Sequence, residues 1–201
     1  MNDRRQTLKT IVSCALFTSA GAFVSACSRR FHGIDITGAN YASDFHLTDF
    51  DAQPRALSDF KGKVVVLFFG YVHCPDVCPT TLSDLRLLKE KLGADGDKLQ
   101  VLFVSVDPER DTPEVLKTYM TVFDSSFLGL YAGSADKLAA LAREFKIYYK
   151  KVEGKTPASY TVDHTASSYI YDPQGRLRLS SRYGTPVDEV LEDVKRLLAG
   201  D

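Results

Sequence analysis

A continuous apolar stretch that ends at two closely spaced cysteines most constrains what this chain can fold into. Residues 64–71 read VVVLFFGY, a run that is too apolar for a half-exposed strand and too short for a typical helix. It predicts a strand buried on both faces, as in a parallel sheet. Cys74 and Cys78 follow, each directly before a proline, and leucines then recur at helical spacing up to Gly93. The two thiols are therefore expected between a buried strand and the start of a helix.

This position favours chemistry at the cysteine pair. Open α/β sheets bind ligands at the carboxyl ends of their strands, and a helix N-terminus stabilises a thiolate over a thiol. A close pair of cysteines in an exported protein forms a structural disulfide, a redox-active dithiol or part of a metal site. The position at a strand end and the flanking prolines favour a redox-active dithiol or a metal site over a structural disulfide.

The N-terminus has the pattern of an export signal. Arg4 and Arg5 begin a basic segment, an apolar stretch covers residues 10–24, and the sequence VSAC ends at Cys27. This ending resembles the bacterial lipobox, whose cysteine becomes the lipid-bearing first residue of the mature protein. We therefore expect a lipoprotein signal peptide over residues 1–26, lipid attachment at Cys27, and a membrane-anchored protein on the periplasmic, extracytoplasmic face.

Two alternatives concern this N-terminal segment. Residues 3–9, DRRQTLK, resemble the twin-arginine export motif, although Thr7 stands where that motif has an aromatic or large apolar residue. An uncleaved anchor is the other alternative, but the apolar stretch is shorter than the about 20 residues that a spanning helix needs.

The expected processing leaves two free thiols in the mature protein. The 201-residue chain has four cysteines. On cleavage before Cys27, Cys14 leaves with the signal peptide and Cys27 carries lipid, so only Cys74 and Cys78 remain as thiols. The formal net charge is −1, without a basic block outside the leader, which gives no indication of a nucleic-acid partner.

Residues 27–43 are expected to be the lipid-attachment cysteine and a polar linker, and residues 44–201 one domain. Patterns of apolar residues and turn signals predict strands over residues 45–50, 64–71, 99–106, 165–171 and 177–183, with helices after Cys78, from Pro113, over 135–145 and over 187–198. This order, with a dithiol after the first buried strand, is typical of a thioredoxin-like α/β domain with a central mixed β-sheet flanked by helices.

Three segments in this order resemble the Sco family of copper proteins: residues 69–79 (FGYVHCPDVCP), 106–113 (VDPERDTP) and 163–165 (DHT). The resemblance implies that Cys74, Cys78 and His164 bind one copper ion, as Cu(I) or Cu(II). It also implies a role in maturing the CuA centre of cytochrome c oxidase. The oxidase subunit that carries CuA is then the client, and other periplasmic copper chaperones or thioredoxin-like reductases are possible partners.

The chemistry of these side chains agrees with that implication. Two thiolates and one imidazole form a soft site that favours Cu(I) and can also hold Cu(II). A polar segment, residues 149–159, precedes His164 and would let the imidazole approach and leave. We therefore predict a copper metallochaperone rather than a turnover enzyme.

Two redox functions compete with copper delivery. A thiol–disulfide oxidoreductase that keeps the client's cysteines reduced would need the redox-active pair Cys74 and Cys78 but not His164. It is the main alternative. A peroxiredoxin-like peroxidase on the same fold fits the paired cysteines and the histidine poorly.

Several neighbouring residues stay open at this stage. His73 is expected near the site or on the surface rather than as a fourth ligand, because adjacent residues point in different directions. Residues 107–112 should lie at the same sheet edge as the dithiol, where they shape the site, bind a partner or only cap a helix. Asp76 either tunes thiol acidity or faces solvent, and Tyr71 is expected in core or rim packing.

Overall fold

Strand β4 (Val64–Gly70) lies near the middle of the main sheet, and all seven of its residues are buried. The computed structural model describes residues 30–156 and 159–201; the expected signal peptide and Cys27 lie outside them. β4 pairs in parallel with β5 (Leu99–Ser105) and antiparallel with β9 (Ser168–Tyr171). The prediction of a strand buried on both faces is confirmed.

The main sheet has eight strands and is mixed. β4, β5 and β6 run parallel, and the other neighbours pair antiparallel. The spatial order of the strands is β1 (Ile34–Asp35), β10 (Leu177–Ser181), β9, β4, β5, β6 (Leu128–Tyr131), β2 (His46–Asp49) and β3 (Pro54–Ala56). The short strands β1, β3 and β6 were not predicted, because two to four residues carry too little side-chain periodicity to be recognised.

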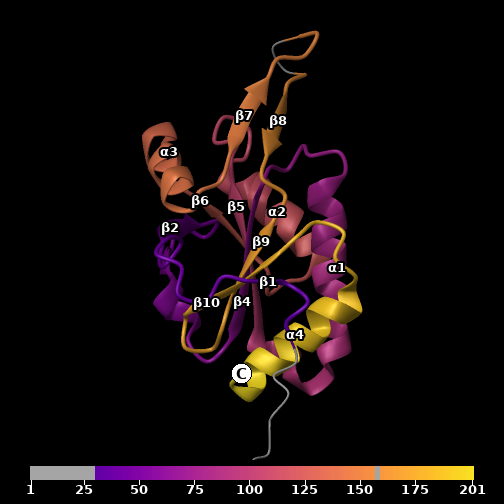
Figure 1. Ribbon diagram of the computed structural model, residues 1–201. Coiled ribbons are helices and arrows are strands. Elements are labelled where there is room, and N and C mark those ends of the chain that lie inside the picture. Colours follow the sequence, from indigo (N-terminus) through magenta and orange to yellow (C-terminus); the bar gives the residue numbers. More distant parts are fainter. Residues whose placement is uncertain (1–29, 157–158) are drawn as a thin grey trace, which may run out of the picture. The chain divides into compact units, whose positions relative to one another are not determined.

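A separate hairpin projects beyond the end of this sheet (Figure 1). Its strands are β7 (Tyr149–Val152) and β8 (Thr161–His164), which pair only with each other. The sequence predicts one strand over residues 165–171; the structure instead has β8 ending at His164 and β9 beginning at Ser168. The segment 149–159, expected as a surface insertion or loose hairpin, contributes the first of these two strands.

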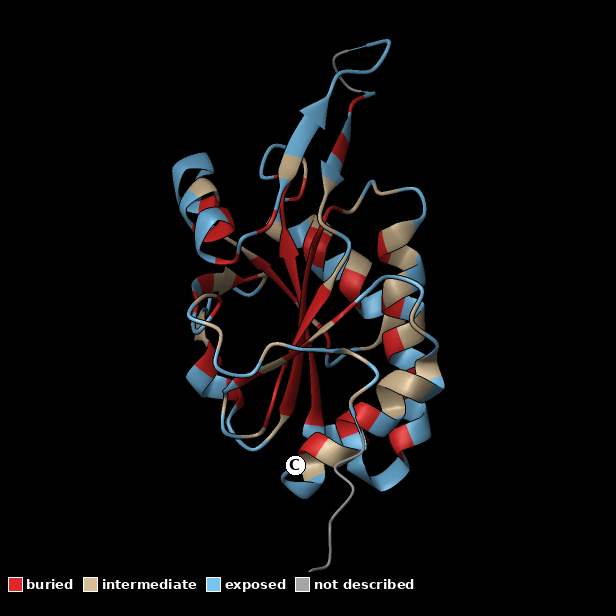
Figure 2. Cartoon of the chain, viewed as in Figure 1, coloured by how far each residue is buried: buried red, intermediate tan, exposed pale blue. Residues whose placement is uncertain are grey.

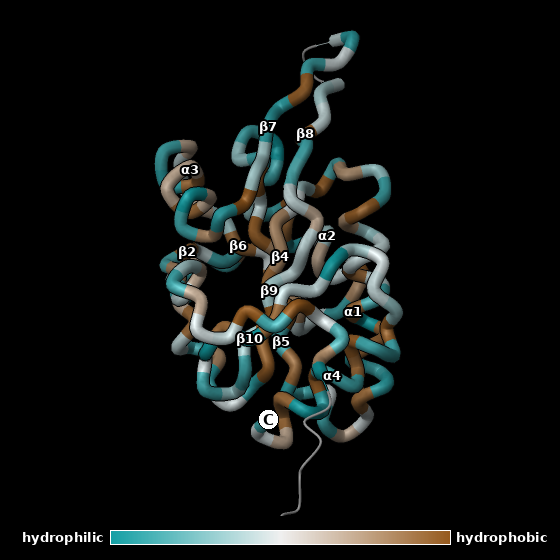
Figure 3. The backbone as a smooth tube through the Cα atoms, in the orientation of Figure 1, coloured by the Kyte–Doolittle hydropathy of each residue, from teal (hydrophilic) through white to brown (hydrophobic). Residues whose placement is uncertain are grey.

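Helices cover both faces of the sheet (Figures 1 and 2). The helices are α1 (Val77–Leu92), α2 (Pro113–Phe123), α3 (Ala135–Glu144) and α4 (Val187–Ala199), with short 3-10 helices η1 (Leu57–Phe60) and η2 (Gly93–Lys98). α1, α2 and α4 pack on one face, where β4 contributes Val64, Val66 and Phe68, and α3 packs on the other. Apolar strands thus fill the centre and polar residues line the outer helix faces (Figure 3). The predicted fold class, an α/β domain with a mixed sheet flanked by helices, is confirmed.

The start of α2 follows the predicted signal. The Thr112 side chain accepts a hydrogen bond from the backbone N–H of Val115, and Pro113 occupies the first helical turn. This cap fixes where the loop after β5 ends, which places residues 107–111 between the strand and the helix.

The segment from residue 31 to 43 differs from the expected linker. β1 pairs with β10, Ala42 is fully buried, and residues 31–201 form one compact unit. The buried Asp193 carboxylate on α4 accepts hydrogen bonds from the backbone N–H groups of His32 at 2.9 Å and Gly33 at 2.8 Å. Backbone hydrogen bonds and scattered apolar side chains, among them Phe31 and Tyr41, make this attachment, and neither leaves a regular pattern in the sequence. Among the helices of residues 30–156 and 159–201, none combines the length and the hydrophobicity of a membrane span.

We expect Asp193→Ala to release the N-terminal segment from α4. Two backbone donors lose their charged acceptor, which should lower the free energy of unfolding by about 1–3 kcal/mol. Denaturant unfolding would measure this change, and hydrogen exchange should show faster exchange of the amides of His32 and Gly33.

Asp188→Ala is the matched control. It also removes a carboxylate from α4, but this carboxylate is exposed and pairs with Lys91 of α1. Its cost should stay below about 1 kcal/mol. Unchanged exchange at His32 and Gly33 in Asp193→Ala would contradict the assigned role of the carboxylate.

Candidate metal centre

The two cysteines lie where β4 turns into α1. Cys74 is half-buried in the connecting loop, Cys78 is fully buried in the first turn of α1, and both are free thiols. The backbone N–H of Cys74 donates to the carbonyl of Tyr71 at 3.1 Å, which folds the loop back toward the strand end. The predicted placement of the dithiol, between a buried strand and a helix start, is confirmed.

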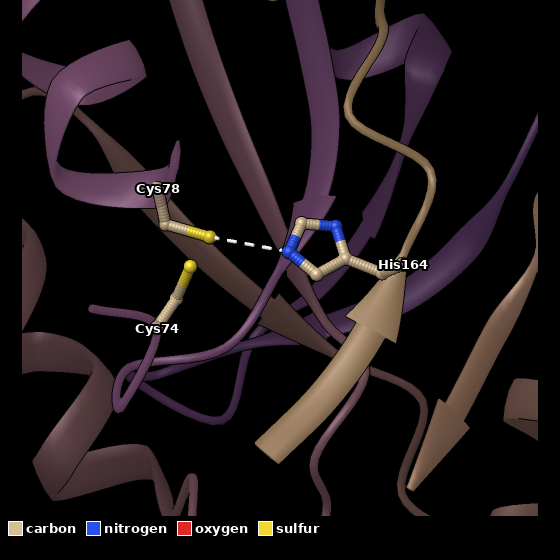
Figure 4. A group of neighbouring side chains, drawn as sticks. All are labelled: Cys74, Cys78 and His164. Atoms are coloured by element: carbon tan, nitrogen blue, oxygen red, sulfur yellow. Dashed lines mark hydrogen bonds between the residues drawn. The ribbon is translucent and has the colours of Figure 1, made fainter. Parts of the chain in front are cut away.

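His164 reaches the dithiol from the projecting hairpin (Figure 4). Its Nε2 atom lies 3.6 Å from the Sγ atom of Cys78. Its Nδ1 atom lies 3.1 Å from the carbonyl oxygen of Thr165, which can only accept a hydrogen bond. Nδ1 therefore carries the proton, and Nε2 presents its lone pair toward the sulfurs, the tautomer that a metal-ligating histidine needs. The ring of Tyr71 packs edge-on against the imidazole, with ring centroids 5.9 Å apart.

The sulfur atoms of Cys74 and Cys78 and a ring nitrogen of His164 all lie within 4.8 Å of one another. Across residues 30–156 and 159–201, this is the single group of at least three histidine, cysteine or carboxylate side chains close enough to share an ion. Two thiols and one imidazole suit a soft ion such as Cu(I). The fold thus gathers three residues that the sequence separates by up to 90 positions.

The two thiols differ in acidity. A hydrogen bond from the Cys78 thiol is the main cause that lowers the pKa of Cys74 to about 3, against the opposing effect of burial. The pKa of Cys78 is raised, because its proton is shared with Cys74 and because the side chain is buried. The pair therefore holds one proton at neutral pH, with the charge on the more accessible sulfur.

Asp111 supports the loop that leads to Cys74. Its buried carboxylate accepts the backbone N–H of Val72 at 3.2 and 3.3 Å and the hydroxyl of Ser105 at 2.6 Å. Burial raises the pKa of Asp111 to about 6. Residues 107–112 therefore lie at the same edge as the dithiol, as predicted. Asp111 shapes the site, and Thr112 separately caps the helix.

Gly70, the last residue of β4, allows the close approach of Cys78. A Cβ atom at this position would lie 2.6 Å from the Sγ atom of Cys78 and 2.6 Å from the ring of Phe103. Cys78 thus packs directly against the strand backbone. This role was not predicted from the sequence, in which the available signal is a glycine at the end of an otherwise bulky apolar run.

Other residues considered from the sequence lie outside the cluster. His73 is exposed and is not part of the three-residue group. Asp76 is also exposed, with a carboxylate oxygen 3.5 Å from the hydroxyl of Tyr183. His32 lies against Glu192 of α4, and His46 is exposed at the start of β2.

Comparison with known proteins decides the family. The family model described as SCO1/SenC matches residues 35–199. The chain belongs to the SCO1/SenC family. ScoI from Bradyrhizobium japonicum, whose structure was solved with copper bound, is 40% identical, with a TM-score of 0.69 over 77% of this chain and 97% of that one. Apo Sco1 from Thermus thermophilus is 41% identical, with a TM-score of 0.73 over 85% of this chain and 99% of that one.

A mitochondrial relative extends the comparison. The SCO2 homolog of Mus musculus is 34% identical over 158 residues, which cover 78% of this chain. The chain spans 62% of the length of that mouse protein. These relationships confirm the predicted thioredoxin-like fold and membership of the Sco family, in which copper-binding proteins occur.

We expect Cys74 to be alkylated by iodoacetamide at pH 5 about as fast as at neutral pH, because its lowered pKa keeps it a thiolate. An ordinary thiol, with a pKa of about 8.5, would react about a hundredfold more slowly at pH 5 than at pH 7. Mass spectrometry of the peptide that contains Cys74 would follow the rate. In Cys78→Ala, which removes the main hydrogen-bond donor, the onset of reaction should move to higher pH. A rate that falls tenfold per pH unit below pH 8 in the wild type would contradict this assignment.

Gly70→Ala should displace the Cys78 thiol from its recess. We expect a loss of about 1–3 kcal/mol in the free energy of unfolding from overpacking, together with faster reaction of Cys78 with thiol reagents. Gly129→Ala is the matched control, since its Cβ atom would lie 3.2 Å from atoms of Leu116 and Met120, in contact with neither cysteine. It should leave the reactivity of Cys78 unchanged. Unaltered reactivity of Cys78 in Gly70→Ala would contradict the role of the glycine.

Proposed function

We propose that this protein is a copper metallochaperone that binds one copper ion through Cys74, Cys78 and His164 and serves the maturation of the CuA centre of cytochrome c oxidase. One observation carries the proposal. The three donor atoms lie within 4.8 Å of one another, although they come from two separate elements, the β4–α1 corner and the β7–β8 hairpin. Convergence of soft donors from distant segments is expected of a metal site and has no role in a simple structural disulfide.

The arrangement suits binding and release of Cu(I) or Cu(II). Cys74 offers a thiolate at neutral pH, so that copper binding displaces only the one proton held by the pair. His164 is the last residue of a strand that pairs with no strand of the main sheet, so the imidazole is less tightly held than the fully buried Cys78. The copper-bound state of the relative from Bradyrhizobium japonicum supports copper as the cargo.

We further propose that the client is the oxidase subunit that carries CuA, and that other copper chaperones or thioredoxin-like reductases supply the metal or electrons. The resemblance to the Sco family supports both parts. The lipobox-like sequence supports the signal peptide over residues 1–26, lipid attachment at Cys27 and a periplasmic location.

Thiol–disulfide exchange is a second function that one observation favours. The Cys74 thiolate is partly accessible and the Cys78 thiol lies directly beside it. Cys74 would attack a disulfide in the client, and Cys78 would then displace the second client thiol. The client gains two electrons, and its two sulfurs take up the Cys78 proton and one proton from solvent to become thiols, while this protein is left with a Cys74–Cys78 disulfide.

An anaerobic copper titration of the full chain in mild detergent tests the main proposal. We expect one tightly held copper with two sulfur ligands and one nitrogen ligand by X-ray absorption. His164→Ala and Cys78→Ser should each weaken binding at least about tenfold, the equivalent of about 1.4 kcal/mol. His73→Ala is the matched control, because this exposed histidine lies next to Cys74 but outside the cluster.

The variants also separate the two functions. Reduction of a client peptide disulfide should be abolished by Cys78→Ser and retained by His164→Ala, whereas copper binding needs both residues. Copper affinity that is unchanged in His164→Ala would overturn the metal site proposed here.

A further inference from the structure

We propose that Asp107 and Arg110, in the loop that follows β5, are positioning residues that fix His164 relative to the dithiol by holding the β7–β8 hairpin. The inference rests on the proposed function, because it takes His164 as a copper ligand. Neither residue touches the three donor atoms of the cluster, so both act through the hairpin.

The attachment of the hairpin decides where the imidazole lies. β7 and β8 pair only with each other, and the hairpin extends past the edge of the main sheet (Figure 1). His164 is the last residue of β8. The ladder of the main sheet therefore does not set the position of the ligand. Contacts at the base of the hairpin must do so.

Three side-chain contacts join the hairpin to this one loop. The hydroxyl of Tyr160 donates to Asp107 at 2.7 Å, and Nη1 of Arg110 donates to the carbonyl of Tyr160 at 3.0 Å. Lys151 pairs with Glu109 at 2.8 Å. Within the described part of the chain, no ion pair joins the hairpin to any other segment.

Two of these contacts are buried and mutually supporting. Asp107 and Tyr160 are 3% and 5% exposed. The guanidinium of Arg110 stacks on the ring of Tyr160 at 3.5 Å and pairs with Asp107, Nε to Oδ2, at 2.5 Å. A partly buried guanidinium that is both stacked and paired holds its partners in one geometry, whereas the exposed Lys151–Glu109 pair contributes little.

The network also reaches the ligand by packing. The Arg110 guanidinium lies 5.7 Å from the centre of the Tyr71 ring, and that ring contacts the imidazole of His164 edge-on at 5.9 Å. On the other side, Asp111 of the same loop holds the backbone of Val72 before the dithiol. One loop thus fixes both halves of the cluster, the cysteine loop through Asp111 and the histidine hairpin through Asp107 and Arg110.

Helix capping does not account for these side chains. The Thr112 hydroxyl supplies the cap of α2, and the polar contacts of Asp107 and Arg110 lie within the loop or on the hairpin. A buried carboxylate and a partly buried guanidinium that both contact the histidine hairpin are expected if the position of the hairpin matters.

A double-mutant cycle on the full chain in mild detergent tests this role. The variants are Arg110→Gln, His164→Ala and their combination, with copper affinity measured by competition with a Cu(I) chelator and ligands counted by X-ray absorption. Arg86→Gln is the matched control, since it removes an exposed arginine–carboxylate pair with Glu90 on α1. We expect Arg110→Gln to weaken copper binding at least tenfold with loss of the nitrogen ligand and retention of both sulfurs. In the His164→Ala background it should change affinity less than twofold, because the residue through which it acts is gone.

The outcomes separate this inference from the proposed function. An equal loss in both backgrounds, or unchanged affinity and nitrogen count in Arg110→Gln, overturns the positioning role and leaves the copper site standing. Unchanged affinity in His164→Ala alone overturns the copper site and the inference with it. If Arg110→Gln loses cooperative unfolding, Tyr160→Phe, which removes only the hydroxyl bonded to Asp107, takes its place in the same cycle.

Discussion

The parallel pairing of β4 with β5 in the buried centre of the sheet is the constraint on which the site depends. Because parallel strands end at the same edge, the loops after Gly70 and after Ser105 emerge side by side. The first loop carries the dithiol, and the second carries the carboxylate of Asp111 that binds the first loop. Because both strands are buried and paired, the positions of the two polar loops relative to each other are fixed.

The histidine comes from a part of the fold with a different kind of order. Cys78 is locked between a strand end and a helix, where adding one carbon atom at Gly70 would displace it. His164 stands on a hairpin that no main-sheet strand pairs with and that polar, aromatic and apolar side-chain contacts hold in place, the last through Val162. One half locked into the sheet and one half held by side-chain contacts would suit the binding and release of copper proposed above.

These contrasts explain what could be predicted from the sequence. Apolar runs and amphipathic stripes revealed β4, β5 and α4, since burial leaves a pattern in side chains. The motif around Cys74, Cys78 and His164 named the cluster through its resemblance to a family. Other features were missed, because they depend on backbone hydrogen bonds or on contacts between distant segments. These are the attachment of residues 31–43, the strand β6, the close packing at Gly70 and the contacts of Arg110 with the hairpin.

The unequal exposure of the two sulfurs has a consequence for any exchange of ligands with a partner. Cys78 is fully enclosed, whereas Cys74 is half-buried and His164 stands on the projecting hairpin. In the copper site proposed above, a thiol from a partner would therefore approach from the side of Cys74 and His164. The partner's ligands would therefore replace those of this protein in a fixed order, and the sulfur of Cys78 would be the last to dissociate from the ion.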